Sequence, residues 1–146
     1  MVISFFGHSD FRKRDLYENT LIKNIKEISK HEPLTLFFGE YGEFDRFAYS
    51  VCKNCNEISK HSHFVFVTPY LNDKINEYKS YYDEILYPPL EKVPLKLAII
   101  YRNRWIVDNS DYIFFYVSRN FGGAHKAFEY AQKRGKNFLN LKDVEI

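Results

Sequence analysis

Five of the six glycines in this sequence stand directly after or shortly beyond short apolar runs, where a strand would give way to a loop. They are Gly7 after residues 2–6, Gly39 and Gly42 after residues 34–38, and Gly122 and Gly123 beyond residues 112–117. Glycine lets a phosphate approach the backbone closely, and unpaired N–H groups at a helix N-terminus form a ready anion site. Each glycine alone is also explained by a tight turn, so the prediction of a phosphate-bearing ligand rests on their common placement.

Arg102 is the cation most suited to such a ligand. Its guanidinium could pair bidentately with a phosphate, or it could extend from a buried helix toward water as a plain structural residue. Asn103 and Trp105 add a polar and a stacking group nearby. Asp45 could accept a hydrogen bond from a ribose hydroxyl, or it could simply interact with the dipole of its own helix.

Aromatic and charged side chains elsewhere give further candidates. Tyr41, Phe44 and Tyr70 could stack on a base, although core packing explains Phe44 at least as well. Arg12 lies in a basic triplet that could attract the anion or form a solvated turn. Glu129 could stabilise an oxocarbenium-like sugar or be an exposed surface carboxylate.

Four segments, taken together, resemble the SLOG superfamily. That superfamily includes the lonely-guy phosphoribohydrolases and stand-alone proteins assigned to nucleotide-derived ligands. The segments are Gly7-His8, Gly39-x-x-Gly42-x-x-Asp45, Arg102-Asn103-x-x-x-Val107-Asp108-x-x-Asp111 and Gly122-Gly123-Ala124. The resemblance covers nearly the whole chain except residues 70–94.

The loops and the resemblance together give an expected ligand-binding set, with Glu129 and Arg102 as catalytic candidates if the protein is an enzyme. The ligand-binding set is Gly7, His8, Arg12, Gly39, Glu40, Tyr41, Gly42, Asp45, Pro69, Tyr70, Arg102, Asn103, Trp105, Gly122, Gly123, Ala124 and Lys126. No cofactor and no metal are expected. The dinucleotide fingerprint and the glycine-rich lysine loop of nucleoside triphosphatases are both absent, so neither hydride transfer nor triphosphate hydrolysis is supported.

Residues 122–129 differ from the lonely-guy pattern Gly-Gly-x-Gly-Thr-x-x-Glu. The first two glycines and Glu129 are kept, but His125 and Lys126 replace the third glycine and the threonine. We expect these bulky side chains to obstruct the approach of a phosphate to the helix start, although Lys126 could pair with a phosphate placed differently. Glu40 stands where many relatives have glycine and is expected to bring a carboxylate toward the phosphate region. The resemblance therefore favours a binding protein over an N-glycosidic-bond hydrolase, which is kept as the alternative.

Apolar runs alternate with helical patterns along the chain. Strands are predicted at residues 2–6, 34–38, 64–67, 112–117 and 137–141, with a possible short piece at 84–87. A helix capped by Asp15 is predicted after the first run, and Gly122-Gly123 opens another that reaches about residue 134. Alternation of this kind predicts a Rossmann-like three-layer α/β fold with a mostly parallel sheet and helices on both faces, with ligands bound outside the carboxyl ends of the strands.

Two helices need separate treatment. Residues 44–58 place Cys52 and Cys55 on one apolar stripe, which favours buried cysteines over a zinc site with His61 and His63. Residues 95–107 are apolar almost all round, which predicts burial on more than one side and a homodimer or larger homo-oligomer built on this helix.

Length, composition and charge limit the number of domains and the classes of partner that the protein can be expected to have. The 146 residues, 45% of them hydrophobic, suit a single domain spanning residues 1–146. A net charge of +2 is too small for the field expected of a non-specific nucleic-acid binder, so a nucleic-acid partner is not expected. No run is long enough to span a membrane and no signal peptide is recognisable, so we expect a cytoplasmic protein with no membrane partner.

Overall fold

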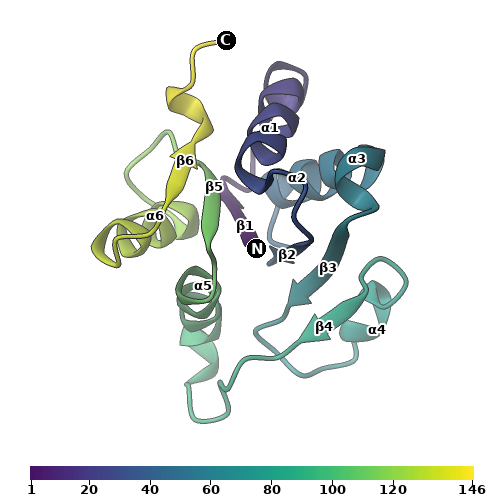
Figure 1. Cartoon of the computed structure of the whole chain (residues 1–146). Helices are drawn as coiled ribbons and strands as arrows, with labels where there is room; N and C mark the ends of the chain where they lie inside the picture. The colour runs from purple at the N-terminus through teal and green to yellow at the C-terminus, as the bar shows by residue number, and fades with distance from the viewer.

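The computed structural model describes residues 1–146 as one six-stranded parallel sheet with helices on both faces (Figure 1). The strands lie in the order β4-β3-β2-β1-β5-β6. They are β1 (Val2–Gly7), β2 (Leu34–Phe38), β3 (Ser62–Val67), β4 (Glu84–Leu86), β5 (Tyr112–Tyr116) and β6 (Phe138–Asn140). The helices are α1 (Arg14–Ser29), α2 (Glu43–Asn54), α3 (Asn56–Ser59), α4 (Ile75–Tyr78), α5 (Ala98–Asp108) and α6 (Gly123–Lys133), with 3-10 turns at Leu95–Leu97 and Leu141–Asp143. The predicted Rossmann-like three-layer fold is confirmed.

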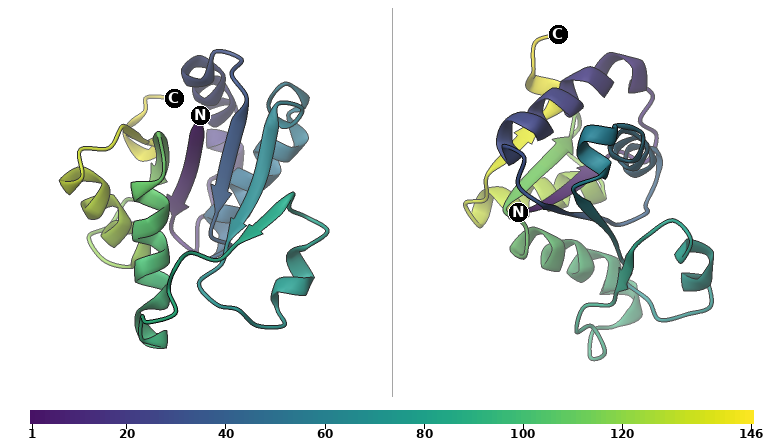
Figure 2. Two further views of the ribbon diagram at one scale, coloured as in Figure 1. Left: turned by 60° about the horizontal axis from the view of Figure 1, so that its bottom comes forward. Right: turned by 45° about the vertical axis from the view of Figure 1, so that its right-hand side comes forward.

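The sheet separates two hydrophobic cores, because successive strand residues point to opposite faces. Phe5 of β1 joins the core beneath α1 and α2, whereas its neighbour Phe6 joins the core beneath α5 and α6. Figure 2 shows the strands side by side with their arrowheads directed the same way. The carboxyl ends of all six strands therefore meet at one edge of the sheet. None of the helices is long and apolar enough to cross a membrane.

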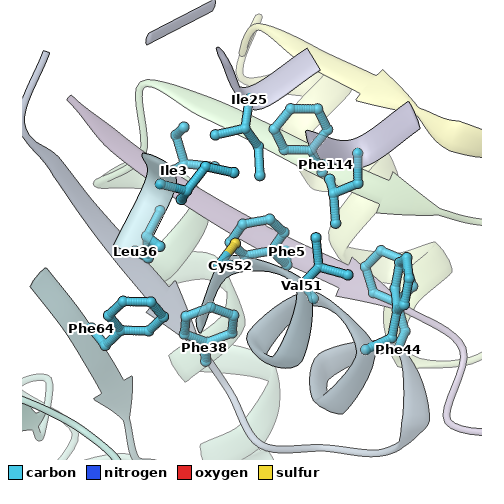
Figure 3. Packing of buried hydrophobic residues seen from close by; sticks show 14 of the residues in the cluster. Ile3, Phe5, Ile25, Leu36, Phe38, Phe44, Val51, Cys52, Phe64 and Phe114 are labelled. Carbon is cyan, nitrogen blue, oxygen red and sulfur yellow. The ribbon is translucent and has the colours of Figure 1, made fainter. Parts of the chain in front are cut away.

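Four stacked phenylalanines cross the middle of the sheet in the first core. Phe64 of β3, Phe38 of β2, Phe5 of β1 and Phe114 of β5 form a row whose neighbouring ring centroids lie 6.0, 5.1 and 5.9 Å apart. The ring planes of neighbours differ by only 5 to 16°. Figure 3 shows the rings of Phe64, Phe38 and Phe5 following one another toward the helix that carries Cys52. Stacked rings add to the stability gained from burial, so this row favours one register for the strands that carry the loops.

Two expectations about helix boundaries are wrong. Asp15 does not cap α1: the helix begins at Arg14 after Lys13, without a side-chain cap, and Asp15 lies in the first turn where its charge suits the helix dipole. The cysteine-bearing segment is two helices, because Cys55 is extended and separates α2 from α3. Cys52 is buried as expected, but Cys55 is only partly so.

Helix α5 is covered by its own domain on one side. Ala98, Ile106 and Val107 are buried, whereas Tyr101 and the preceding Leu95 are exposed. The chain itself therefore buries only one side of this helix, and burial of a second side would need another subunit. Assembly through its exposed side stays a prediction.

The phenylalanine row predicts a large effect of one core substitution. Phe38→Ala should lower the free energy of unfolding by about 3–5 kcal/mol, because a fully buried ring with stacked neighbours on both sides is lost. Urea unfolding checks this. Phe121→Ala is the matched control: its ring is 63% exposed, so the change should stay within about 0.5 kcal/mol. Equal losses in the two variants would contradict the importance of the row.

Candidate functional site

A cavity of about 310 Å³ lies at the carboxyl edge of the sheet, where the strand order reverses between β1 and β5. Ligands of open α/β sheets bind at such switch points. Ten residues of the expected ligand-binding set line it: Gly7, His8, Gly39, Tyr41, Asp45, Arg102, Asn103, Gly122, Gly123 and Ala124. The three glycine loops therefore converge on one cavity, as the sequence predicts.

The N-terminus of α6 opens into this cavity. Gly122 precedes the helix with φ 94°, a left-handed conformation that favours glycine, and Gly123 is the first helical residue. No other atom lies within 4 Å of where a Cβ would stand on either glycine. The first hydrogen bond of the helix joins the Lys126 N–H to the Gly122 carbonyl at 3.1 Å. The N–H groups before Lys126 have no acceptor within the helix, so this end is open to an anion.

Two other glycines serve close packing between the first two loops. A Cβ on Gly7 would stand 2.1 Å from Cγ of the buried Phe44, and a Cβ on Gly42 would stand 2.5 Å from Cα of Ser9. The Glu43 N–H also donates to the Ser9 carbonyl at 3.0 Å. Gly7 still lines the cavity, but Gly42 lies outside it. Phe44 is a core residue, in agreement with the plainer of its two interpretations.

Arg102 forms the floor of the cavity and is only 2% exposed. Its Nη1 donates to the carbonyls of Gly39 at 3.0 Å and Val67 at 2.7 Å, the carboxyl ends of β2 and β3. Its Nε donates to Oδ1 of Asn103 at 2.9 Å. A Cβ on Gly39 would stand 3.1 Å from the guanidinium carbon, so glycine makes room for this side chain. Arg102 thus anchors the carboxyl ends of β2 and β3 as well as bringing a cation to the cavity.

Asp45 is the buried carboxylate of the site. It lies in the first turn of α2, and its Oδ2 accepts the Tyr41 N–H at 2.6 Å. Burial raises the pKa of Asp45 to about 6, although the Tyr41 N–H and the charge of Arg102 act in the opposite direction. Burial also lowers the pKa of Arg102 to about 10, so the guanidinium stays charged at neutral pH. Asp45 fixes the loop that carries Tyr41 at the cavity wall.

His8 connects the loops after β1 and β5. Its Nε2 accepts the Ser118 N–H at 2.9 Å. Burial, followed by the charge of Arg119, lowers the pKa of His8, which favours the neutral ring that this hydrogen bond needs. Arg119 in turn pairs with Asp10. These contacts hold two walls of the cavity together.

Seven lining residues were not predicted: Phe5, Phe6, Ser9, Asp10, Ile99, Arg119 and Phe121. Phe121 and Tyr41 are the exposed aromatics of the rim, at 63% and 59% exposure, and Arg119 lies over the Phe121 ring. Exposed rings at a cavity rim can stack on a base. Arg119 and Phe121 stand just before Gly122 in the sequence, and this position is the signal that could have identified them.

Seven residues of the expected set, Lys126 among them, lie outside the cavity. Arg12 lines separate surface grooves, Gly42 contacts Ser9, and Trp105 packs on Phe37 with ring centroids 5.6 Å apart. Pro69 and Tyr70 follow β3 without lining the cavity. Glu40 has φ 52°, a left-handed backbone conformation that glycine adopts more readily than glutamate. Its Oε1 accepts a hydrogen bond from the buried Tyr82, so the expectation that it faces a phosphate is wrong.

Lys126 and Glu129 line a second groove between α5 and α6 instead of the cavity. His125 pairs with Glu129 across one helical turn, with Nε2 and Oε1 3.3 Å apart. The expectation that His125 and Lys126 obstruct the phosphate position is therefore wrong, because neither side chain lines the cavity. His61 and His63 do not join the cysteines, and no group of three His, Cys, Asp or Glu side chains could hold a metal ion.

The sequence matches no protein-family model and no curated protein. Several solved structures share the fold, including the two that follow. DNA processing protein A from Helicobacter pylori, described for its single-stranded DNA binding mode, matches 94% of this chain with a TM-score of 0.63 and 16% identity. The protein TM1055 also matches 94% of this chain, with a TM-score of 0.58 and 12% identity. This chain corresponds to 63% of the first protein's length and 71% of the second's. The likeness shows that this chain shares the fold of these two proteins.

The first of these structures corrects one expectation. A protein of this fold binds single-stranded DNA, so excluding a nucleic-acid partner for this chain was wrong. The exclusion relied on a net charge of +2, which averages over the whole surface. Cations can still gather locally, and Arg104, Lys126 and Lys133 line the groove between α5 and α6.

The buried carboxylate predicts a pH dependence of stability. Because the pKa of Asp45 is higher in the folded than in the unfolded chain, the folded protein binds the extra proton, and stability falls as pH rises from about 4 to about 6. Asp45→Asn removes this loss. As pH rises from 4 to 7, the unfolding free energy of the wild type should therefore fall by about 2–3 kcal/mol relative to that of the variant. Denaturant unfolding across that range measures it, with the exposed Asp73→Asn as control. A difference independent of pH would contradict the assignment.

Proposed function

We propose that the protein binds a nucleotide or nucleotide-derived phosphate compound in the cavity at the carboxyl edge of the sheet. The observation that carries this proposal is the open N-terminus of α6, whose Gly122 and Gly123 line the same cavity as Gly7, Gly39 and Arg102. Backbone N–H groups at the positive end of the helix dipole would receive the phosphate. Arg102 would contribute its charge from the floor of the cavity.

The other walls suit the rest of a nucleotide. Tyr41 and Phe121 present exposed rings on which a base could stack. The Asp45 carboxylate also lines the cavity, and although one of its oxygens accepts the Tyr41 N–H, it retains acceptor capacity for a ribose hydroxyl. Phosphate, sugar and base thus each have a group of suitable chemistry within one site.

Binding without cleavage is favoured over hydrolysis of the N-glycosidic bond. The carboxylate expected to act in a lonely-guy enzyme corresponds to Glu129, which lies in the neighbouring groove and is paired with His125. Catalytic groups must lie close to the reacting atoms, and a displacement of about 1 Å can cost about a hundredfold in rate. Glu129 is therefore poorly placed to stabilise a sugar cation in the glycine-lined cavity.

Filling the cavity at the helix start should weaken binding without harming the fold. Gly123→Val should weaken binding of nucleoside 5′-monophosphates by about tenfold or more, a loss of about 1.4 kcal/mol, because its methyl groups enter space that the phosphate needs. Thermal unfolding should stay near that of the wild type, since no atom is near the new Cβ. Calorimetric titration with a panel of monophosphates and cyclic nucleotides measures the affinity. Gln132→Val, at the other end of α6, is the control, and wild-type affinity in Gly123→Val would refute the site.

The same panel separates binding from catalysis. Incubation of the protein with nucleoside 5′-monophosphates should release no free base above the level of a protein-free sample, as judged by chromatography. The reason is the placement of Glu129 outside the cavity. Base release that disappears in Glu129→Ala would establish the hydrolase alternative in place of simple binding.

A further inference from the structure

The groove between α5 and α6 adjoins the cavity. It has a volume of about 330 Å³, and it shares Ile99, Asn103 and Gly123 with the cavity. The two hollows therefore meet beside the N-terminus of α6. The cavity alone is at the lower end of ordinary small-molecule sites, whereas the two together reach the middle of that range. A ligand that occupies the cavity can extend into the groove without leaving the protein surface.

The groove carries positive charge that the protein does not neutralise. Arg104 of α5 and Lys126 and Lys133 of α6 line it, and none of the three has a carboxylate partner within 4.0 Å. Glu129 is the one carboxylate of the lining, and it is paired with His125. Three free cations around one hollow attract an anion.

Aromatic rings hold one of these cations in place and provide an apolar surface. The Arg104 guanidinium lies over the rings of Tyr101 and Tyr130, 5.3 and 5.4 Å from their centroids. Tyr130 is itself fixed, because its hydroxyl donates to Asp108 at 2.8 Å. Cation–π contact orients the guanidinium before any ligand arrives. Together with Ile99 and Ile100, the Tyr130 ring offers apolar surface in the groove to a sugar or a base.

Charge also decides between a ligand and a second copy of the chain. A two-fold contact places the same patch on both subunits, so it would bring the unpaired cations of this groove close to their own copies. Like charges placed opposite one another are unfavourable. An anionic occupant is therefore the better match.

We propose that cavity and groove form one site for a 5′-phosphorylated dinucleotide. One phosphate binds at the N-terminus of α6, and the second nucleotide lies in the groove with its phosphate among Arg104, Lys126 and Lys133. This assignment rests on the proposed nucleotide binding in the cavity. The positive charge of the groove, and its direct connection to the cavity, are what specify a dinucleotide as the ligand class.

Calorimetry with two ligands tests the assignment. The wild type should bind 5′-phosphorylated diadenylate about tenfold or more tightly than adenosine 5′-monophosphate. The double variant Lys126→Ala/Lys133→Ala should lose most of that advantage, while its affinity for the monophosphate stays within about twofold of the wild type. A matched control, Lys23→Ala/Lys79→Ala, removes two exposed lysines of the same charge from other surfaces and should keep the advantage.

Each other outcome has a distinct meaning. Equal affinities for the two ligands, with no effect of the groove variant, would overturn the dinucleotide assignment and leave nucleotide binding in the cavity intact. Failure of both ligands to bind would refute the proposed function and the assignment with it. If longer oligonucleotides bind progressively more tightly than the dinucleotide, the ligand is an extended single strand of nucleic acid and the dinucleotide assignment is wrong. A change of oligomeric state in the groove variant, seen by sedimentation, would show that a second copy occupies the groove.

Discussion

The buried guanidinium of Arg102 is the contact on which the geometry of the site depends. From α5 it donates to the carbonyls that end β2 and β3, and it lies so close to Gly39 that a Cβ there would stand 3.1 Å from the guanidinium carbon. Truncating a buried charged donor leaves its partners unsatisfied, so these carbonyls need this cation. The same guanidinium lies close enough to Asp45 to favour ionisation of that carboxyl. One side chain thus connects the second helix layer, two strand ends and the loop that carries Tyr41.

The stacked phenylalanines determine where those strand ends lie. The row from Phe64 through Phe38 and Phe5 to Phe114 crosses β3, β2, β1 and β5, and three of these strands lead into loops of the cavity. A one-residue slip would turn each ring to the other face of the sheet. The core therefore fixes the register, and the register brings the glycines after β1, β2 and β5 to one place.

The sequence predicts the architecture well because its signals are local. Apolar runs ended by Gly7 or Gly39, alternating with helical patterns, suffice to predict a parallel sheet, and parallel topology brings the loops to one edge. Long-range contacts are less accessible. The hydrogen bond from Tyr82 to Glu40 has no sequence signature, since the two residues are 42 positions apart. The same holds for the hydrogen bonds of Arg102 to the ends of β2 and β3, whose partners are 63 and 35 positions away.

Side-chain direction limits what a motif alone can predict about the site. The segment Gly122 to Glu129 reads as one phosphate and catalytic motif, yet the structure divides it. Its first residues line the cavity, while Lys126 and Glu129 line the adjoining groove. On a helix, residues that follow one another face different directions, so proximity in a motif does not ensure proximity in space. Arg119 and Phe121 show the converse, because no motif contains them and both line the cavity.

Titration of isotope-labelled protein with a nucleoside 5′-monophosphate, followed by amide chemical shifts, tests the central claim most directly. Binding at the open end of α6 should shift the amide resonances of Gly123 and Ala124 most strongly, with smaller shifts at Gly7 and Gly39, and all four should saturate together. Absence of shifts, or largest shifts at residues remote from the carboxyl edge of the sheet, would contradict nucleotide binding in this cavity.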